Sequence, residues 1–177
     1  MWTKGDVFDG TIDDARVYDR ALSEAEVKAL DGRPVGRLRF DEGARQTAGG
    51  SSGFGSPGTL VDGPAWVNGR PGKALDFDGA GDYVSIPTSA TLEFNDAITV
   101  AAWIKTDTVS GDHRIVKRNG GSGTYQWVLV TEGDQTTFDF CTDTWSGVNR
   151  RTISRREHPL HNPPFCCPRL RNRLLPR

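Results

Sequence analysis

Two aspartates flank a glycine-rich turn in the middle of the chain, in the sequence Asp78-Gly79-Ala80-Gly81-Asp82. Calcium binds about six to eight oxygen atoms and takes many of them from carboxylates. Aspartate beside glycine is also the usual composition of a tight turn, because its side chain accepts hydrogen bonds from nearby backbone amides. The residue types and their spacing therefore leave two interpretations of Asp78 and Asp82 open: calcium ligands, or turn chemistry alone.

A second pair of carboxylates lies farther along the chain. Asp139, Cys141 and Asp143 occupy alternate positions, so their side chains share one face of a predicted strand. A pair of carboxylates can hydrolyse glycosidic bonds, and a retaining pair stands about 5–5.5 Å apart. Solvated acids on the outer face of a sheet have the same spacing. The sequence shows no Ser/His/Asp cluster, and His113 stands in a Gly-Asp-His turn, so we predict that the chain is not an enzyme.

Aromatic residues that stack against sugar rings are concentrated in the same region. The predicted carbohydrate-binding residues are Tyr125, Trp127, Asp143 and Trp145, and Trp103 is a further aromatic on a strand-like run. The aromatic rings would stack on the sugar, and the aspartate would accept hydrogen bonds from it. Burial in a sandwich core is the alternative for each ring, because a buried aromatic side chain contributes roughly 1.5–3 kcal/mol to folding.

The charge of the chain is unevenly distributed. The formal net charge is -1, but residues 1–145 carry -8, whereas residues 146–177 carry eight arginines, one acid and five prolines. Proline removes hydrogen-bond donors from strands and breaks helices. We predict that residues 146–177 are an Arg/Pro-rich tail that is disordered or results from translation out of frame. A basic arm for nucleic acid is the third alternative, and we predict no nucleic-acid partner.

The remaining composition excludes a few classes of protein. The three cysteines, Cys141, Cys166 and Cys167, make neither a disulfide framework nor a zinc-binding pattern. No apolar run approaches the roughly 20 residues that a membrane span needs. The first residues lack the apolar segment of a secretory signal. We predict no membrane span and no signal peptide in this chain, whose 177 residues suffice for about one domain.

Short strand-like runs separated by glycine, asparagine and aspartate turns dominate residues 74–145. Leu75 and Phe77 alternate with Asp76 and Asp78, and residues 99–105 are largely apolar on both faces, which favours a strand between packed layers. About eight or nine strands are predicted, which is typical of a β-sandwich. One helix is predicted from Ser23 to Leu30, because Ser23 and Glu26 form a capping box.

Three stretches of the chain resemble the laminin-G-like, concanavalin A-like jelly-roll family: residues 12–27 (IDDARVYDRALSEAEV), residues 73–79 (KALDFDG) and residues 97–107 (AITVAAWIKTD). In that family the first pattern closes the fold and the second opens it. The resemblance implies an all-β chain: an incomplete antiparallel jelly-roll β-sandwich with one short helix and a disordered tail. Residues 1–33 would be the closing strand and helix of one module, and residues 34–145 the N-terminal part of a second. In the alternative, residues 1–33 supply the closing strand to residues 36–145 of a permuted domain.

The resemblance also implies a structural calcium ion that joins the closing strand to the opening strand. The matching positions are Asp13 or Asp14 and the vicinity of Glu42 and Gly43, and Asp78 and Asp82 are further oxygen donors. We expect residues 11–18 to pair with residues 36–41, which would bring these two groups together. The glutamate pattern of the family's hydrolases, E-x-D-x-E, is absent from the chain.

The function that the resemblance implies is a non-catalytic binding or adhesion module from a larger multi-domain protein, extracellular or on the cell surface. Its partners would be polysaccharides or glycoproteins. The alternative is an accessory domain of a secreted glycoside hydrolase whose catalytic part lies outside this chain. An incomplete sandwich also leaves sheet edges open, which favours self-association.

Overall fold

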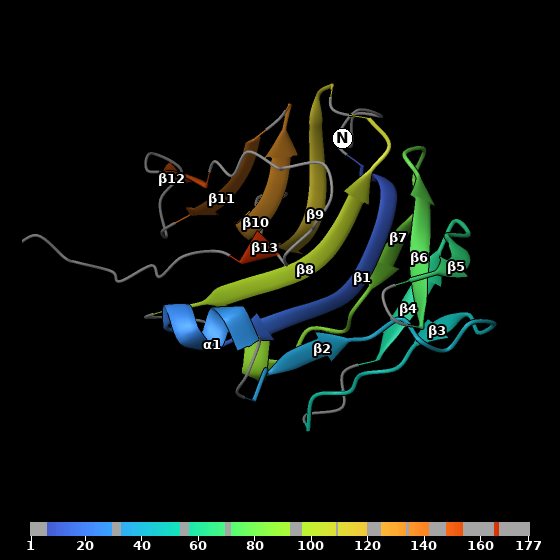
Figure 1. The fold of residues 1–177 in the computed structure, drawn as a ribbon, viewed down its shortest axis with the longest axis horizontal. Helices are drawn as coiled ribbons and strands as arrows, with labels where there is room; N and C mark the ends of the chain where they lie inside the picture. The colour runs from blue at the N-terminus through green and yellow to red at the C-terminus, as the bar shows by residue number, and fades with distance from the viewer. Residues whose placement is uncertain are drawn as a thin grey trace, which may run out of the picture.

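A computed structural model describes residues 7–29, 33–53, 57–69, 72–92, 97–108, 110–119, 125–133, 135–141, 148–153 and 165–166. Within these ranges the chain forms thirteen strands, more than predicted, with one α-helix and one 3-10 turn, η1, at Ala90–Leu92 (Figure 1). Every pair of named strands is antiparallel. The prediction of an all-β chain of the jelly-roll sandwich type with one short helix is confirmed.

The largest sheet, called the central sheet below, has the strand order β13-β8-β1-β6-β5, and β2 also pairs with β1. Its strands come from distant parts of the sequence: β1 (Asp9–Tyr18), β2 (Gly36–Leu38), β5 (Ala65–Asn68), β6 (Lys73–Asp78), β8 (Thr99–Thr106) and β13 (Phe165–Cys166). Figure 1 shows β1 and β8 running side by side through the middle of the molecule.

Two further sheets complete the fold. The meander sheet has the order β12-β11-β10-β9 and consists of β9 (Asp112–Asn119), β10 (Tyr125–Glu132), β11 (Gln135–Cys141) and β12 (Val148–Ile153). A small sheet contains β3 (Thr47–Ala48), β4 (Gly58–Val61) and β7 (Tyr83–Ser85). Among the residues described, the outer strands of the three sheets are open to further pairing, so self-association stays a prediction.

Strand β1 lies inside the central sheet. It pairs along its length with β8, at one end with β6 and at the other with β2. Ala15 pairs with Leu38 and Val17 with Gly36, so the predicted pairing of residues 11–18 with the 36–41 segment is present. Strands β1, β2, β5, β6 and β8 therefore share one sheet, which is the arrangement of the permuted alternative. The predicted module boundaries stay a prediction.

The hydrophobic core lies between the central sheet and the meander sheet. The apolar positions of the alternating strands meet there: Ile12, Leu75, Val100 and Ala102 from one side, and Ile115, Trp127, Leu129 and Phe138 from the other. The rings of Trp127 and Phe138 stack, with centroids 6.2 Å apart and planes 21° from parallel. Burying these side chains contributes roughly 1.5–3 kcal/mol each, and this burial decides which face of each strand points inward.

The helix α1 (Glu24–Ala29) forms where the capping box predicted it. The backbone amide and hydroxyl of Ser23 donate to a carboxylate oxygen of Glu26, each at 2.8 Å, and the Glu26 amide donates to the Ser23 hydroxyl at 3.4 Å. The ion pair with Arg20 and the two hydrogen bonds from Ser23 lower the pKa of Glu26 to about 2. The cap thus fixes the chain reversal after β1.

Two segments of the predicted tail form strands. Strand β12 pairs with β11 over six residues, from Val148 to Ile153, and β13 pairs with β8. The meander sheet therefore continues beyond the predicted boundary at residue 145. Composition does not reveal such pairing, because edge strands are joined through main-chain groups that every residue except proline carries in full. The rest of residues 146–177 lies outside the described ranges.

Candidate functional site

Asp14 lies at a β-bulge of β1, where the register with β8 shifts between Asp13 and Arg16. Its backbone is left-handed, with φ 45°, which aspartate tolerates better than most residues. The Asp14 carboxylate accepts hydrogen bonds from Arg16 of β1, and from Arg37 of β2 at 2.8 and 3.2 Å. The Asp14, Arg16 and Arg37 side chains are only 15%, 13% and 21% exposed.

Electrostatics keep this carboxylate ionised. Burial raises the pKa of Asp14, but the hydrogen bonds and charges of Arg16 and Arg37 outweigh burial, so its pKa lies below the usual 3.8. Both oxygens of Asp14 therefore bind guanidinium groups that join β1 to β2. The resemblance implied that calcium joins the closing strand to the opening strand at this position. In the structure, the carboxylate predicted to bind calcium binds two arginines instead.

The other predicted metal residues near the opening strand lie in different surroundings. Asp13 is 6% exposed, and one of its oxygens lies under Gly69, 2.7 Å from where a β-carbon at that glycine would stand. Glu42 accepts a hydrogen bond from the Gly49 amide at 2.7 Å, and Gly43 has φ 74° beside the stem of Lys73. Each of these residues has a local structural role.

Asp78 and Asp82 form the turn that their spacing predicted. The Ala80 amide donates to Asp78 at 2.7 Å, and the Asp78 amide donates to Asp82 at 3.3 Å. Asp82 is 7% exposed. Burial raises the pKa of Asp82, and the charges of Asp78, Asp62 and Asp76 raise it further against the hydrogen bond from Asp78. Negative charge is therefore concentrated at this end of β6.

The structure does not assemble the six predicted metal residues at one place. Within the described ranges, no three acidic, histidine or cysteine side chains are arranged to hold a metal ion. The residues instead divide into an arginine-bound carboxylate at Asp14, local contacts at Asp13, Glu42 and Gly43, and the turn at Asp78 and Asp82. Calcium binding stays a prediction.

The predicted sugar site requires a correction. Trp127 is 7% exposed and belongs to the hydrophobic core, so it presents no face to a ligand. The alternative interpretation of the aromatics as core residues applies to it, because β10 packs against the central sheet. Tyr125 begins β10. Asp143 and Trp145 lie outside the described residues.

Only one of the two carboxylates considered for catalysis lies within the described residues. Asp139 of β11 is 4% exposed, and Asp143 lies outside the described ranges. His113 is also buried, at 8% exposed, and its two ring nitrogens contact the carbonyl oxygens of Val7 at 2.9 Å and Ser110 at 2.8 Å. This histidine connects β9 to the residues just before β1, which is a structural role.

A group of side chains that the sequence did not assemble lies on the central sheet, on the face away from the core. Because Ile12, Leu75 and Ala102 point into the core, their strand neighbours point outward. The register places Asp9 opposite Asp78, Thr11 between Asp76 and Lys105, and Asp13 opposite Trp103. We call the following residues the outer acidic face: Asp9, Asp13, Asp76, Asp78, Trp103 and Asp107.

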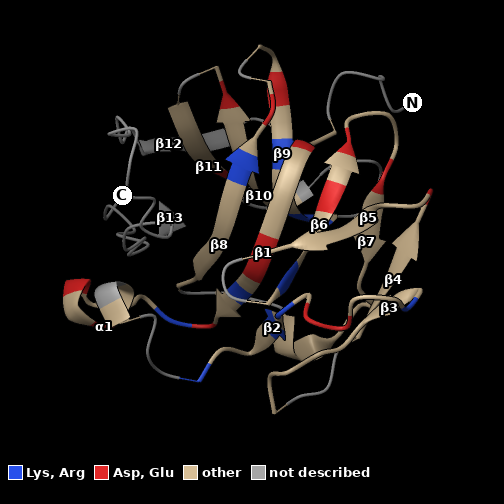
Figure 2. Ribbon diagram, turned by 45° about the vertical axis from the view of Figure 1, so that its right-hand side comes forward, with Lys and Arg blue, Asp and Glu red and all other residues tan. Residues whose placement is uncertain are grey.

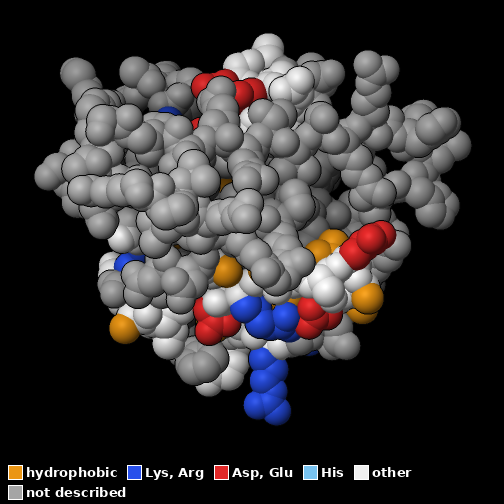
Figure 3. Space-filling model, turned by 90° about the vertical axis from the view of Figure 1, so that its left-hand side faces the viewer, with side chains coloured by type: hydrophobic (Ala, Val, Ile, Leu, Met, Phe, Trp, Pro, Cys, Tyr) orange, Lys and Arg blue, Asp and Glu red, His pale blue; other side chains and the backbone are white. Residues whose placement is uncertain are grey.

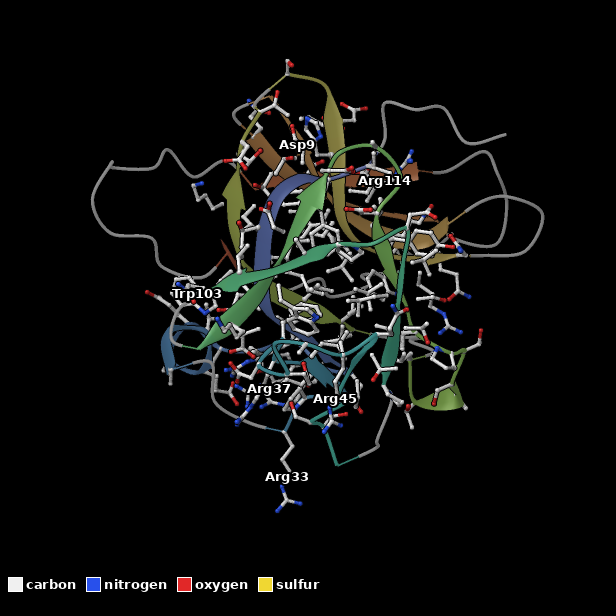
Figure 4. All side chains as sticks on the ribbon, turned by 90° about the vertical axis from the view of Figure 1, so that its right-hand side faces the viewer. Asp9, Arg33, Arg37, Arg45, Trp103 and Arg114 are labelled. Atoms are coloured by element: carbon white, nitrogen blue, oxygen red, sulfur yellow. The ribbon has the colours of Figure 1, made fainter. Side chains whose placement is uncertain are left out.

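One side-chain hydrogen bond connects neighbouring strands of the outer acidic face: Thr11 of β1 donates to Asp76 of β6 at 3.0 Å. At the end of β8, the Lys105 ammonium group lies 3.0 Å from Asp107. Figure 2 shows acidic positions on β1 and β6 next to the basic position on β8. Figure 4 shows Asp9 at the upper end of the sheet and Trp103 farther down, at its left edge. On the side that carries α1, by contrast, described acidic and basic side chains lie next to one another (Figure 3).

Comparison with known families matches residues 78–158, a little under half of the chain, to the Laminin_G_3 model of the concanavalin A-like lectin/glucanases superfamily. No curated protein and no solved structure matched the chain in the corresponding comparisons. The match includes β8 to β11 but not residues 12–27, whose resemblance stays a prediction. None of the helices in the described part is long and apolar enough to cross a membrane. Residues 78–158 therefore form a laminin-G-like segment of the concanavalin A-like lectin/glucanase superfamily.

Proposed function

We propose that this chain is a non-catalytic recognition module that binds a polysaccharide or the glycan of a glycoprotein. The observation that carries the proposal is the superfamily match of residues 78–158, since this superfamily joins lectins and glucanases in one fold. The outer acidic face supports it, because it offers a half-buried tryptophan beside carboxylates that can accept hydrogen bonds from sugar hydroxyls.

The absence of catalysis is part of the proposal. A general acid or base must come within hydrogen-bond reach of its substrate, about 2.6–3.2 Å or through one water. Asp139, the described member of the carboxylate pair considered for catalysis, is buried in the meander sheet. Its burial supports a structural role.

The second candidate is an accessory domain of a secreted glycoside hydrolase, which the glucanase members of the superfamily favour. The flanking sequence separates the two candidates. An E-x-D-x-E pattern there would favour the hydrolase, and tandem copies of IDDARVY would favour an adhesion protein. Laminin-G-like domains are typically extracellular, and we propose the same location for the protein that contains this one.

The test of recognition is binding of the full chain to a panel of immobilised polysaccharides: neutral, anionic and rich in amino sugars. We expect at least one polymer to retain the folded chain, and heat-denatured chain to pass through as the control. Retention of no polymer and no glycoprotein would contradict recognition. Release of reducing ends from a retained polymer would contradict the absence of catalysis.

Calcium is a separate proposal, and we place it at Asp78 and Asp82. These two carboxylates share a turn and have no ion pair with a basic side chain in the part of the chain described. Any ion held there would need backbone or water oxygens as well. Burial raises the pKa of Asp82, the neighbouring aspartates raise it further, and a cation would offset their repulsion.

Addition of millimolar calcium is therefore expected to raise the melting temperature. A ligand at ten times its Kd stabilises the folded state by about 1.4 kcal/mol, which is about 3–6 °C for a chain of this size. The substitution Asp82→Asn should remove the shift, whereas Asp112→Asn, an exposed position on β9, should keep it. An unchanged melting temperature of the unsubstituted protein would exclude the site.

A further inference from the structure

We propose that the outer acidic face binds a positively charged glycan, a polymer rich in free amino sugars such as glucosamine, with Trp103 as its stacking residue. The proposal rests on the proposed function and specifies its ligand class and its site. It follows from three features of the central sheet: the alignment of side chains across the strands, the sign of their charge, and the position of the tryptophan.

The alignment comes from strand register. Asp13 stands opposite Trp103, Thr11 opposite Lys105 and Asp76, and Asp9 opposite Asp78. Consecutive outward residues of a strand are about 6.6 Å apart. The face therefore extends about 13 Å along β1, from the row of Asp13 and Trp103 to the row of Asp9 and Asp78. Neighbouring strands add about 4.8 Å each in the other direction. The face is therefore large enough for a short oligosaccharide rather than a single ion.

The charge of the face selects the ligand. Five aspartates contribute to it, from β1, β6 and the end of β8, and its described basic side chain, Lys105, already lies 3.0 Å from Asp107. Asp78 and Asp107 are exposed, and Asp9 and Asp76 are half-buried. Like charges across an interface disfavour binding, whereas complementary charges favour it. Sulfated and uronic-acid polymers are therefore disfavoured, and ammonium-bearing sugars are favoured.

Trp103 adds an attraction that is specific to cations. Its neighbours Ala102 and Ile104 pack into the core, so its indole stands on the outer surface, where it is half-buried. Tryptophan is the aromatic side chain that binds ammonium groups best over its ring face, and the interaction contributes about 0.5–2 kcal/mol. An N-acetylated amine carries no charge, so the ring favours an amino sugar over its N-acetylated form.

The experiment measures binding of glucosamine oligomers to the full chain by calorimetry, at mildly acid pH where the amines carry charge. N-acetylated oligomers, heparin and polylysine are the comparison ligands. We expect Trp103→Ala to weaken glucosamine binding about tenfold, and Asp76→Asn to weaken it severalfold. The matched controls Tyr83→Ala, an exposed aromatic on β7, and Asp112→Asn should leave it unchanged. Higher salt should also weaken binding of the charged oligomers, because exposed charges are screened.

Other outcomes overturn the inference. If the chain retains neutral or anionic polymers but not glucosamine oligomers, the inference fails and the proposed recognition function stands. If the original chain binds glucosamine oligomers, and the Trp103→Ala and Asp76→Asn variants bind them equally tightly, the binding site lies elsewhere on the molecule. If polylysine binds as well and Trp103→Ala has no effect, the face attracts cations by charge alone. Should Trp103→Ala fail to fold, Asp76→Asn combined with Asp107→Asn gives the deciding result.

Discussion

Replacing Asp14 by asparagine is expected to destabilise the protein by about 2 kcal/mol, because it leaves two partly buried arginine charges uncompensated, at a cost between those of surface and fully buried ion pairs. The two guanidinium groups that would remain belong to Arg16 and Arg37, which are only 13% and 21% exposed. Asparagine tolerates the left-handed backbone at this position as aspartate does, so the substitution removes the charge and leaves the bulge in place.

Denaturant unfolding of the variant and the original chain measures the effect, with Asp19→Asn, an exposed position just after β1, as the control. The folded-state pKa of Asp14 lies below its usual 3.8, so its contribution is complete above 3.8 and is lost as the pH falls through the folded-state value. The difference between the two proteins should shrink in that acid range. A loss of stability below about 1 kcal/mol at neutral pH would mean that the ion pairs of Asp14 with Arg16 and Arg37 contribute no more than a surface ion pair.

Replacing Gly10 by alanine is expected to cost about 3 kcal/mol or more and to open the pairing between β1 and β8. Gly10 has φ 132°, a conformation that side chains rarely adopt. An added β-carbon would overlap the carbonyl oxygen of Lys105 and stand 2.9 Å from the α-carbon of Thr106. Both contacts are with backbone, so they can be relieved only when the two strands separate.

The matched control is Gly63→Ala. Gly63 also has a positive φ, 99°, but nothing lies within 4 Å of where its β-carbon would stand. This variant therefore carries backbone strain of about 1–3 kcal/mol without the overlap. Thermal and denaturant unfolding measures the stability of both variants. The difference between their losses of stability is the cost of the steric overlap at Gly10. Equal stability of the two variants would contradict the central position of β1 and would favour residues 1–33 belonging to a separate module.

Local patterns were sufficient for some elements of this fold, although not for all thirteen strands. Leu75 and Phe77 alternate with Asp76 and Asp78 in the sequence, and β6 places these two sets on opposite faces. The capping box of Ser23 and Glu26 located α1 to within one residue at each end. Such predictions succeed because alternation and capping depend on residues only a few positions apart.

The candidate site was harder to predict from the sequence, because its residues are brought together by pairing between strands that are distant in the chain. Trp103 and Trp127 both lie in strands rich in apolar residues, and Trp127, but not Trp103, was among the predicted sugar-binding residues. In the structure, Trp127 points between the sheets and stacks on Phe138, whereas Trp103 points away from them. Which face of a strand is covered depends on the neighbouring sheet, and no local pattern carries that information.

The sequence by itself determined that the chain is a β-protein with one capped helix, an acidic body and a turn at Asp78 to Asp82, since all of these depend on composition or short spacing. Only the tertiary structure decided where β1 lies, which carboxylate binds the two arginines, and which acids share a face with Trp103. These contacts cannot be predicted locally because they join distant parts of the chain: the residues of β1 that pair with β6 and β8 are sixty or more positions away from their partners. Burial of the whole core stabilises such contacts, and no single segment specifies them.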